Sequence, residues 1–153
     1  MANASDVSAD LLAIKDKFGG TWTLTKNEKL DEYLKLIGLN FLFRKVAMAA
    51  GCTLEISVEG DKVRFITKGP KTSNHAFLLN TELEDDDPVG NAMTAVVTFT
   101  DGKIVTTSKP RGKSKAKDTT VTREVITRED GKQELIMTVN AGEVEMKRYF
   151  EKQ

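Results

Sequence analysis

Apolar and polar residues alternate along most of the chain after residue 52, which is the pattern of strands that bury one face. In the last such stretch one phase is mostly charged, and the other consists of Val144, Met146, Arg148 and Phe150. This stretch predicts a strand with one solvated face and one apolar face that carries a guanidinium. Similar runs occur between Leu54 and Val139, separated by turn pairs such as Asp101-Gly102 and Asp130-Gly131.

The first third of the chain adds one strand and two helices. Residues 18–26 alternate threonines with Trp22 and Leu24, which predicts a strand whose tryptophan plugs the core. Residues 28–50 have apolar positions at i, i+3, i+4 and i+7 from Leu30 and a break at Gly38, so we expect a hairpin of two short helices. One strand, two helices and about nine further strands indicate an all-β antiparallel meander. A meander of this length normally closes into a barrel, since closure removes its edges.

The N-terminal residues follow a different pattern, because they are small and polar until Leu11, Leu12 and Ile14. We expect residues 1–17 to be an extension that is loose or partly helical. Residues 18–153 are expected to form the barrel domain.

Composition limits the partners of this domain. The 153 residues are 39% hydrophobic and 30% charged, which suits one soluble domain, and the 23 basic and 23 acidic residues leave no net field to attract nucleic acid. The single Cys52 and the lack of a signal peptide favour the cytoplasm. The sequence gives no reason to expect more than a monomer.

The interior of the predicted barrel carries the candidate chemistry. A barrel of about ten strands is too wide for side chains to fill, so it encloses a cavity. Arg148 and Arg123 share their strand phases with apolar neighbours, and Thr106 and Ser108 share the phase of Ile104. An apolar cavity with two guanidiniums suits a long apolar molecule with one carboxylate, because the planar fork of arginine binds carboxylates in a bidentate manner. Alternatively, either arginine bends outward or pairs with an internal acid.

Other functional classes find little support in the sequence. His75 is the only histidine, and no spacing of histidines and carboxylates suggests a catalytic or metal site. The acidic run 84–87 lacks the ligand spacing of a calcium loop and is interpreted as a solvated turn. The basic loop 109–117 contains no aromatic residues, which argues against nucleic-acid binding. We therefore expect no catalytic residues, metal or cofactor.

Several stretches resemble one known family, the intracellular lipid-binding proteins, and within it the fatty-acid-binding proteins. Phe18-Gly-Gly-Thr-Trp-Thr-Leu and the run from Leu30 through Arg44-Lys-Val-Ala are similar to the family's first strand and helical lid. Thr122-Arg-Glu-Val and Arg148-Tyr-Phe-Glu-Lys resemble its two arginine-bearing strands. The resemblance covers about residues 18–153 and implies a ten-stranded up-and-down barrel capped by a two-helix lid.

The resemblance also implies a ligand site. In this family an arginine, arginine, tyrosine set binds the ligand carboxylate; Arg123 and Arg148 match it, whereas Phe150 stands where the tyrosine is expected. The missing donor is worth about 1–3 kcal/mol unless water, Thr106 or Ser108 replaces it. The residues expected to line the cavity are Leu30, Tyr33, Ile37, Phe65, Phe77, Met93, Val97, Thr106, Met137 and Val139.

The expected function is therefore that of a carrier for a long-chain fatty acid, with a retinoid or another amphipathic lipid as the alternative. Members of the family often deliver ligand by touching anionic membranes. The helical lid and the cations of the basic loop are candidates for that contact, and a solvated loop is the other interpretation. These cations are Lys109, Arg111, Lys113, Lys115 and Lys117.

Overall fold

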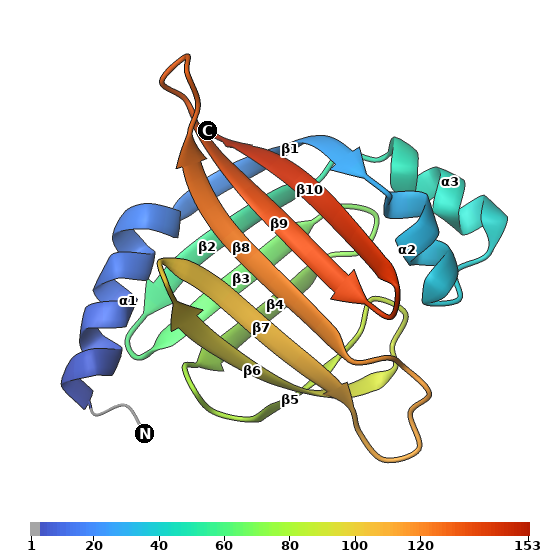
Figure 1. Ribbon diagram of the computed structural model, residues 1–153, viewed down its shortest axis with the longest axis horizontal. Helices are drawn as coiled ribbons and strands as arrows, with labels where there is room; N and C mark the ends of the chain where they lie inside the picture. The colour runs from blue at the N-terminus through green and yellow to red at the C-terminus, as the bar shows by residue number, and fades with distance from the viewer. Residues whose placement is uncertain (1–3) are drawn as a thin grey trace.

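The structure is a computed structural model that describes residues 4–153 (Figure 1). Three helices and ten strands account for most of these residues. In chain order they are α1 (Ala4–Phe18), β1 (Gly20–Glu28), α2 (Leu30–Leu36), α3 (Phe41–Ala49), β2 (Thr53–Glu59), β3 (Lys62–Lys68), β4 (Ser73–Leu78), β5 (Leu83–Asp86), β6 (Ala92–Thr100), β7 (Lys103–Pro110), β8 (Thr119–Thr127), β9 (Gln133–Ala141) and β10 (Val144–Lys152).

The ten strands form one antiparallel sheet in the order β4-β3-β2-β1-β10-β9-β8-β7-β6-β5. The pairing of β1 with β10 joins the first strand to the last, and the sheet curls into a nearly closed barrel. Within residues 4–153 no ladder pairs β4 with β5, and a single bridge between Leu79 and Val97 spans the base of this gap. The predicted all-β, ten-stranded barrel with a helical lid is confirmed.

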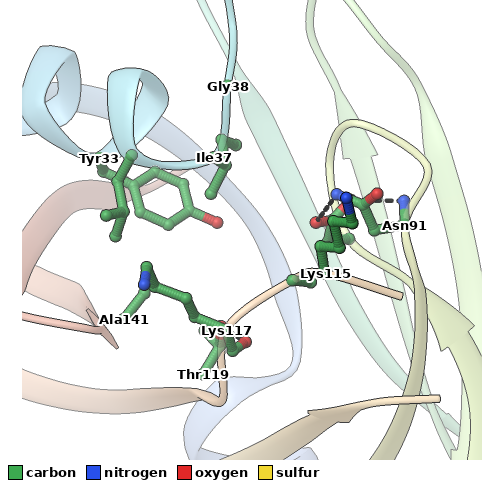
Figure 2. Close-up of a pocket in the computed structure, with 11 residues that line it drawn as sticks. Tyr33, Ile37, Gly38, Asn91, Lys115, Lys117, Thr119 and Ala141 are labelled. Atoms are coloured by element: carbon green, nitrogen blue, oxygen red, sulfur yellow. Dashed lines mark hydrogen bonds between the residues drawn. The ribbon is translucent and has the colours of Figure 1, made fainter. Parts of the chain in front are cut away.

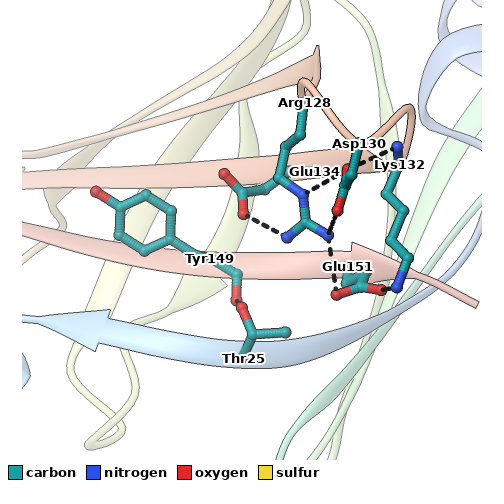
Figure 3. A network of polar contacts seen from close by, with 7 residues as sticks. All are labelled: Thr25, Arg128, Asp130, Lys132, Glu134, Tyr149 and Glu151. Carbon is teal, nitrogen blue, oxygen red and sulfur yellow. Dashed lines mark hydrogen bonds and ion pairs between the residues drawn. The ribbon is translucent and has the colours of Figure 1, made fainter.

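The register of the last strands confirms the predicted strand phase. Met146 is opposite Val139, and Phe150 is opposite Leu135; all four are 2% exposed or less. The other phase of β10 lies outside. There Glu151 pairs with Arg128 and Lys132 at 3.4 and 3.2 Å, beside further contacts of Arg128 with Asp130 and Glu134 (Figure 3).

The described part of the N-terminal extension is the helix α1, which agrees with the partly helical form of the prediction and not with a loose tail. Leu11, Ile14 and Phe18 of α1 are buried against the base of the barrel, and the ring of Phe18 meets that of Phe99 edge-on at 6.4 Å. Their i, i+3, i+7 spacing is that of an amphipathic helix. This stripe was not predicted, because Phe18 was assigned to the first strand. Whether residues 1–17 act as a separate unit stays a prediction, and residues 1–3 lie outside the described part.

Trp22 is fully buried, and its indole Nε1 donates to the Phe18 carbonyl at 2.8 Å. The tryptophan is therefore the expected core residue. Its hydrogen bond also ties the end of α1 to the first strand.

The two lid helices differ in their burial. Leu30, Tyr33 and Leu34 of α2 are buried, and α2 packs over β10. Helix α3 packs on α2, and none of its nine residues is buried. Arg44 fixes this arrangement, because its Nε donates to Asp31 of α2 at 2.8 Å and its Nη1 donates to the Leu39 carbonyl at 2.8 Å.

Candidate functional site

The candidate site lies on the inner face of β8, β9 and β10. Arg123 of β8 and Arg148 of β10 are both opposite Met137 of β9, so the three residues form one row across the sheet. Neighbouring strands are about 4.8 Å apart, which places the two arginine backbones about 10 Å from each other. The structure therefore brings together the two arginines that the sequence analysis selected.

Arg123 extends across the barrel toward the opposite wall. Its guanidinium carbon lies 4.5 Å from the centre of the Phe65 ring on β3. Its Nε is buried and, within residues 4–153, has no hydrogen-bond partner. Burial lowers the pKa of Arg123 from its ordinary value to about 10, so the group is still a cation at neutral pH. This charge has no acidic partner inside the described barrel.

Arg148 is held by neutral neighbours. Its Nε donates to Asn27 Oδ1 at 2.9 Å, and its guanidinium carbon lies 5.9 Å from the Phe150 ring. Burial lowers the pKa of Arg148, although the neighbouring Cys52 thiol and Tyr33 hydroxyl oppose this effect. Asn27 was not predicted, because nothing in the sequence marks one polar residue of β1 as a partner of β10. Among the described residues neither arginine pairs with an internal acid, in contrast to the alternative interpretation.

Phe150, at the expected tyrosine position, is 2% exposed and lies between Leu24 and Leu135. It offers packing area and no hydroxyl. Thr106 is the nearer replacement, since it lies opposite Val121 while Arg123 lies opposite Ile104. Such diagonal neighbours are about 7–8 Å apart, whereas Ser108 is a further step along β7.

The expected cavity residues fall into two apolar groups. Leu30 and Tyr33 of α2 are buried together with Val139 of β9, and Ile37 packs beside them. Phe65, Phe77 and Val97 belong to the barrel core, and Met137 contacts both groups. Met93 is 2% exposed, and Thr106 is half-buried. Contact of these side chains with a ligand stays a prediction.

The acidic run that was interpreted as a solvated turn contributes one inner group. Asp85 Oδ1 is buried and, among the described residues, accepts no hydrogen bond. It lies 3.4 Å from His75 Nδ1, across the gap between β4 and β5. The solvated interpretation is therefore wrong for Asp85. Strand pairing of β5 with β6 turns it inward, and the sequence did not predict that strand at residues 83–86.

A pocket of about 210 Å³ lies at the mouth of the barrel (Figure 2). Helix α2, the turn between β5 and β6, the loop between β7 and β8, and the end of β9 form its walls. Burial, together with the charge of Asp87, raises the pKa of Tyr33 to about 12, so its hydroxyl stays protonated. The residues that line the pocket include Tyr33, Leu36, Asp87, Asn91, Lys115 and Lys117.

The basic loop has two kinds of cation. Arg111 is fixed in place, because its Nε donates to the Met93 carbonyl at 3.3 Å and its Nη1 lies 3.8 Å from Glu84. Lys115 and Lys117 line the mouth pocket, whereas Lys109 and Lys113 do not, and all four residues are exposed. The loop is therefore not a uniform row of five free cations.

An up-and-down barrel with a helical lid and uncompensated cations inside defines a class of small β-barrel proteins that enclose amphipathic ligands. The family model described as "Lipocalin / cytosolic fatty-acid binding protein family" matches residues 19–153. The chain belongs to this family, and only its first 18 residues lie outside the match.

Individual relatives agree with this assignment. The chain is 34% identical over 136 residues to fatty acid-binding protein homolog 5 of Caenorhabditis elegans, which covers 88% of this chain and 96% of that protein. The solved structure of lipid binding protein 8 of C. elegans has a TM-score of 0.80 and 29% identity, with 90% of this chain and 96% of that chain covered. A fatty acid-binding protein from brain tissue of Drosophila melanogaster has a TM-score of 0.75 and 29% identity, with coverage of 87% and 97%.

Two further properties concern only residues 4–153. None of their helices combines the length and the apolar character required to cross a membrane. No three of their histidine, cysteine and acidic side chains are grouped so as to hold a metal ion.

Proposed function

We propose that this protein carries a long-chain fatty acid in its barrel, with the carboxylate bound between Arg123 and Arg148. The observation that supports this proposal is the presence of two inward guanidiniums, in one row, with no acidic partner among the described residues. Such charges are costly to bury unless an anion compensates them. The expected cytoplasmic location and monomeric state stay predictions.

The apolar chain and the head group contribute differently. Burying a sixteen-carbon chain is worth roughly 0.8 kcal/mol per methylene, which gives about 10 kcal/mol before the cost of ordering is subtracted. Hydrogen bonds to a charged group add about 1.5–3 kcal/mol. The chain therefore supplies most of the affinity, and the arginines select the acid and orient it.

Replacing Arg148 by glutamine tests the site. We expect binding of palmitate to weaken roughly tenfold to hundredfold, because one charged hydrogen-bonding partner is lost. Binding of hexadecanol, which has no charge, should change little. Titration of delipidated protein with both ligands measures the difference. Arg64→Gln is the matched control, since Arg64 pairs with Glu59 on the outer face of the barrel.

The outcome also separates the two lipid classes. A variant that keeps the full preference for palmitate over hexadecanol would remove Arg148 from the site. Wild-type protein that binds retinol tightly and palmitate weakly would favour the retinoid alternative, in which the missing tyrosine at Phe150 marks a changed head-group site.

We also propose that ligand is exchanged with anionic membranes through α3. This helix exposes Phe41, Leu42 and Phe43 at 58–69%, and Lys45 lies 4.9 Å above the Phe41 ring. Exposed apolar side chains beside cations suit the surface of an anionic bilayer. The basic loop, at the same end of the barrel, adds further cations.

Transfer of a fluorescent fatty acid to vesicles tests this contact. Leu42→Ser should slow transfer to anionic vesicles, whereas Leu12→Ser, at an equally exposed position on α1 far from the lid, should leave it unchanged. Transfer at one rate to anionic and neutral vesicles, regardless of vesicle concentration, would indicate release through water and reject the proposal.

A further inference from the structure

The mouth pocket contains two lysines that are not used by the fold. The lysine ion pairs of residues 4–153 involve neither Lys115 nor Lys117. Figure 2 shows Lys117 extending from its loop toward Tyr33 and Ala141, while Lys115 extends toward Asn91 on the other side of the pocket. Two ammonium groups thus border one space of about 210 Å³, compared with the ~10–15 Å³ that one water needs.

The position of Lys117 depends on a glycine. Gly142 has φ +56°, and a Cβ built on it would lie 3.0 Å from Lys117 Cδ and 3.6 Å from Leu36 Cδ2. The stem of Lys117 therefore rests on the bare backbone of the turn between β9 and β10, beside α2. This packing directs the side chain of Lys117 along the mouth of the barrel, where it lines the pocket and is still exposed to solvent.

The pocket also offers an acceptor with a free lone pair. Asp87 Oδ1 accepts from the amides of Val89 and Asn91 at 3.0 and 2.8 Å, and Oδ2 accepts from Asn91 Nδ2 at 2.8 Å. A carboxylate has about four acceptor positions, so Oδ2 has room for one more donor. A simple fatty-acid carboxylate has no proton to give at neutral pH. A ligand with a hydroxyl near its anionic group does.

Tyr33 connects this pocket to the inner site. Its ring is buried in the apolar group beneath α2, and the charges of Asp87 and Arg148 both act on its hydroxyl. Tyr33 therefore belongs both to the wall of the pocket and to the apolar group that contains Val139 and Met146 of the barrel. The protonated hydroxyl is a further donor for an anion at the mouth.

We infer that the mouth pocket binds the head group of a single-chain acylglycerol phosphate, with the phosphate on Lys115, Lys117 and the Tyr33 hydroxyl, the free glycerol hydroxyl on Asp87, and the acyl chain in the lumen. A phosphate monoester carries nearly two negative charges at neutral pH, which matches two flexible ammonium groups better than one carboxylate does. This inference rests on the proposed function, because the same lumen must accept the chain.

Competition titrations of the full chain test the inference. The ligands are oleate, oleoyl-glycerol phosphate and mono-oleoyl glycerol, which share one chain and differ in the head group. The Lys115→Gln/Lys117→Gln variant is expected to bind the phosphate lipid about tenfold more weakly, as expected for the loss of charged hydrogen bonds. Its affinities for oleate and mono-oleoyl glycerol should stay within about twofold of wild type. The matched control is Lys109→Gln/Lys113→Gln, which replaces two lysines outside the pocket, one at the end of β7 and one in the same loop.

Other results of these titrations would overturn the inference. Equal losses for the phosphate lipid and oleate, or equal losses in the control variant, would overturn the inference, because they indicate a general electrostatic effect. Wild-type protein that binds oleate and not the phosphate lipid would also overturn it and leave the proposed function intact. Protein that binds none of the three lipids would reject both.

Inorganic phosphate distinguishes a lipid site from a free-phosphate site. Amide NMR shifts at residues 115–119 should respond to phosphate alone only in the millimolar range and should not respond in the Lys115→Gln/Lys117→Gln variant. If phosphate alone bound as tightly as the lipid, the pocket would be a free-phosphate site and the lipid assignment would be wrong.

Discussion

Replacing Arg123 by methionine is expected to stabilise the ligand-free protein while weakening its binding of fatty acids. The guanidinium is buried without an acid, and its Nε, among the described residues, has no hydrogen-bond partner. Methionine has a similar length and no charge, so it can fill the space without these costs. A charged group that is retained for ligand binding reduces the stability of the protein when the ligand is absent.

The lowered pKa of Arg123 gives the size of this effect. A tenfold change in an ionisation constant corresponds to 1.36 kcal/mol, so lowering the pKa of Arg123 from its ordinary value to about 10 corresponds to about 3 kcal/mol. The folded protein holds this proton less tightly than the unfolded chain does. The cost is therefore fully present below about pH 10 and falls as the pH rises toward the pKa of arginine in the unfolded chain. Contact of the guanidinium with the Phe65 ring offsets about 0.5–2 kcal/mol of this cost. The expected net gain for Arg123→Met is about 1–3 kcal/mol at neutral pH.

Urea unfolding of delipidated protein, followed by Trp22 fluorescence, measures this gain. Trp22 is fully buried and is the single tryptophan of the chain, so its signal reports the opening of the core. Arg148→Met is the control. Arg148 has Asn27 as a hydrogen-bond partner, and its replacement leaves the Asn27 amide oxygen without a donor, so no comparable gain is expected.

In the presence of fatty acid, wild type should be more stable than Arg123→Met. A ligand that binds only the folded state stabilises it in proportion to the logarithm of the ligand concentration over Kd, and wild type has the lower Kd. If delipidated Arg123→Met instead unfolded with an unchanged m-value and more than about 1 kcal/mol less stability than wild type, the guanidinium would be a net structural contributor and the reasoning would be wrong.

Three further predictions concern other parts of the molecule. Ile14→Ala should lower the free energy of unfolding by about 2–4 kcal/mol, because Ile14 is fully buried. Leu12→Ala, at an exposed position of the same helix, should lower it by less than about 0.5 kcal/mol. Equal effects of the two substitutions in urea unfolding would mean that α1 does not pack against the barrel through Ile14. Arg44→Gln should speed amide hydrogen exchange in α3 without changing exchange in the barrel strands, and unchanged exchange in α3 would show that this side chain does not hold the lid. Hydrogen bonding to Lys132 lowers the pKa of Glu151, so its stabilisation is present at neutral pH and is lost as the pH falls through the folded-state pKa. The Tm of Glu151→Gln should therefore fall less than that of wild type between pH 5 and 3, and parallel curves would contradict this assignment.

The barrel and the arginine row were predictable because the period of a strand is two. Given antiparallel neighbours, alternation fixes which side chains face inward, and a one-residue error in register would have turned Arg148 and Phe150 outward together. The apolar neighbours of both arginines excluded that error. Hence alternation alone predicts which side chains of β8 and β10 face into the barrel.

The partners of these inner groups were not predictable in the same way. Asn27 lies 121 residues from Arg148 in the chain, and its role depends on a shift in register between Leu24 and Lys26 of β1. Asp85 turned inward through a four-residue strand that has too few positions to show a period. The full length of helix α1 was not predicted, because Phe18 fits both the apolar stripe of a helix and the start of the first strand. In each case a local irregularity decided the contact.

The absence of a hydroxyl at Phe150 is best understood together with the reach of Arg123. With a tyrosine at that position, a donor would stand beside Arg148 on β10, whereas here the ring is fully packed between Leu24 and Leu135. Arg123 instead crosses the lumen to Phe65, so in the proposed site a carboxylate would meet a cation that contacts both walls of the barrel. Drawing Arg123 away from Phe65 costs the ring contact, and the carboxylate restores the hydrogen bonds that the guanidinium lacks. We therefore expect the second arginine to compensate in part for the lost hydroxyl. Phe150→Tyr should then strengthen fatty-acid binding by less than the tenfold expected for an added donor, and a larger gain would show that the two groups act independently.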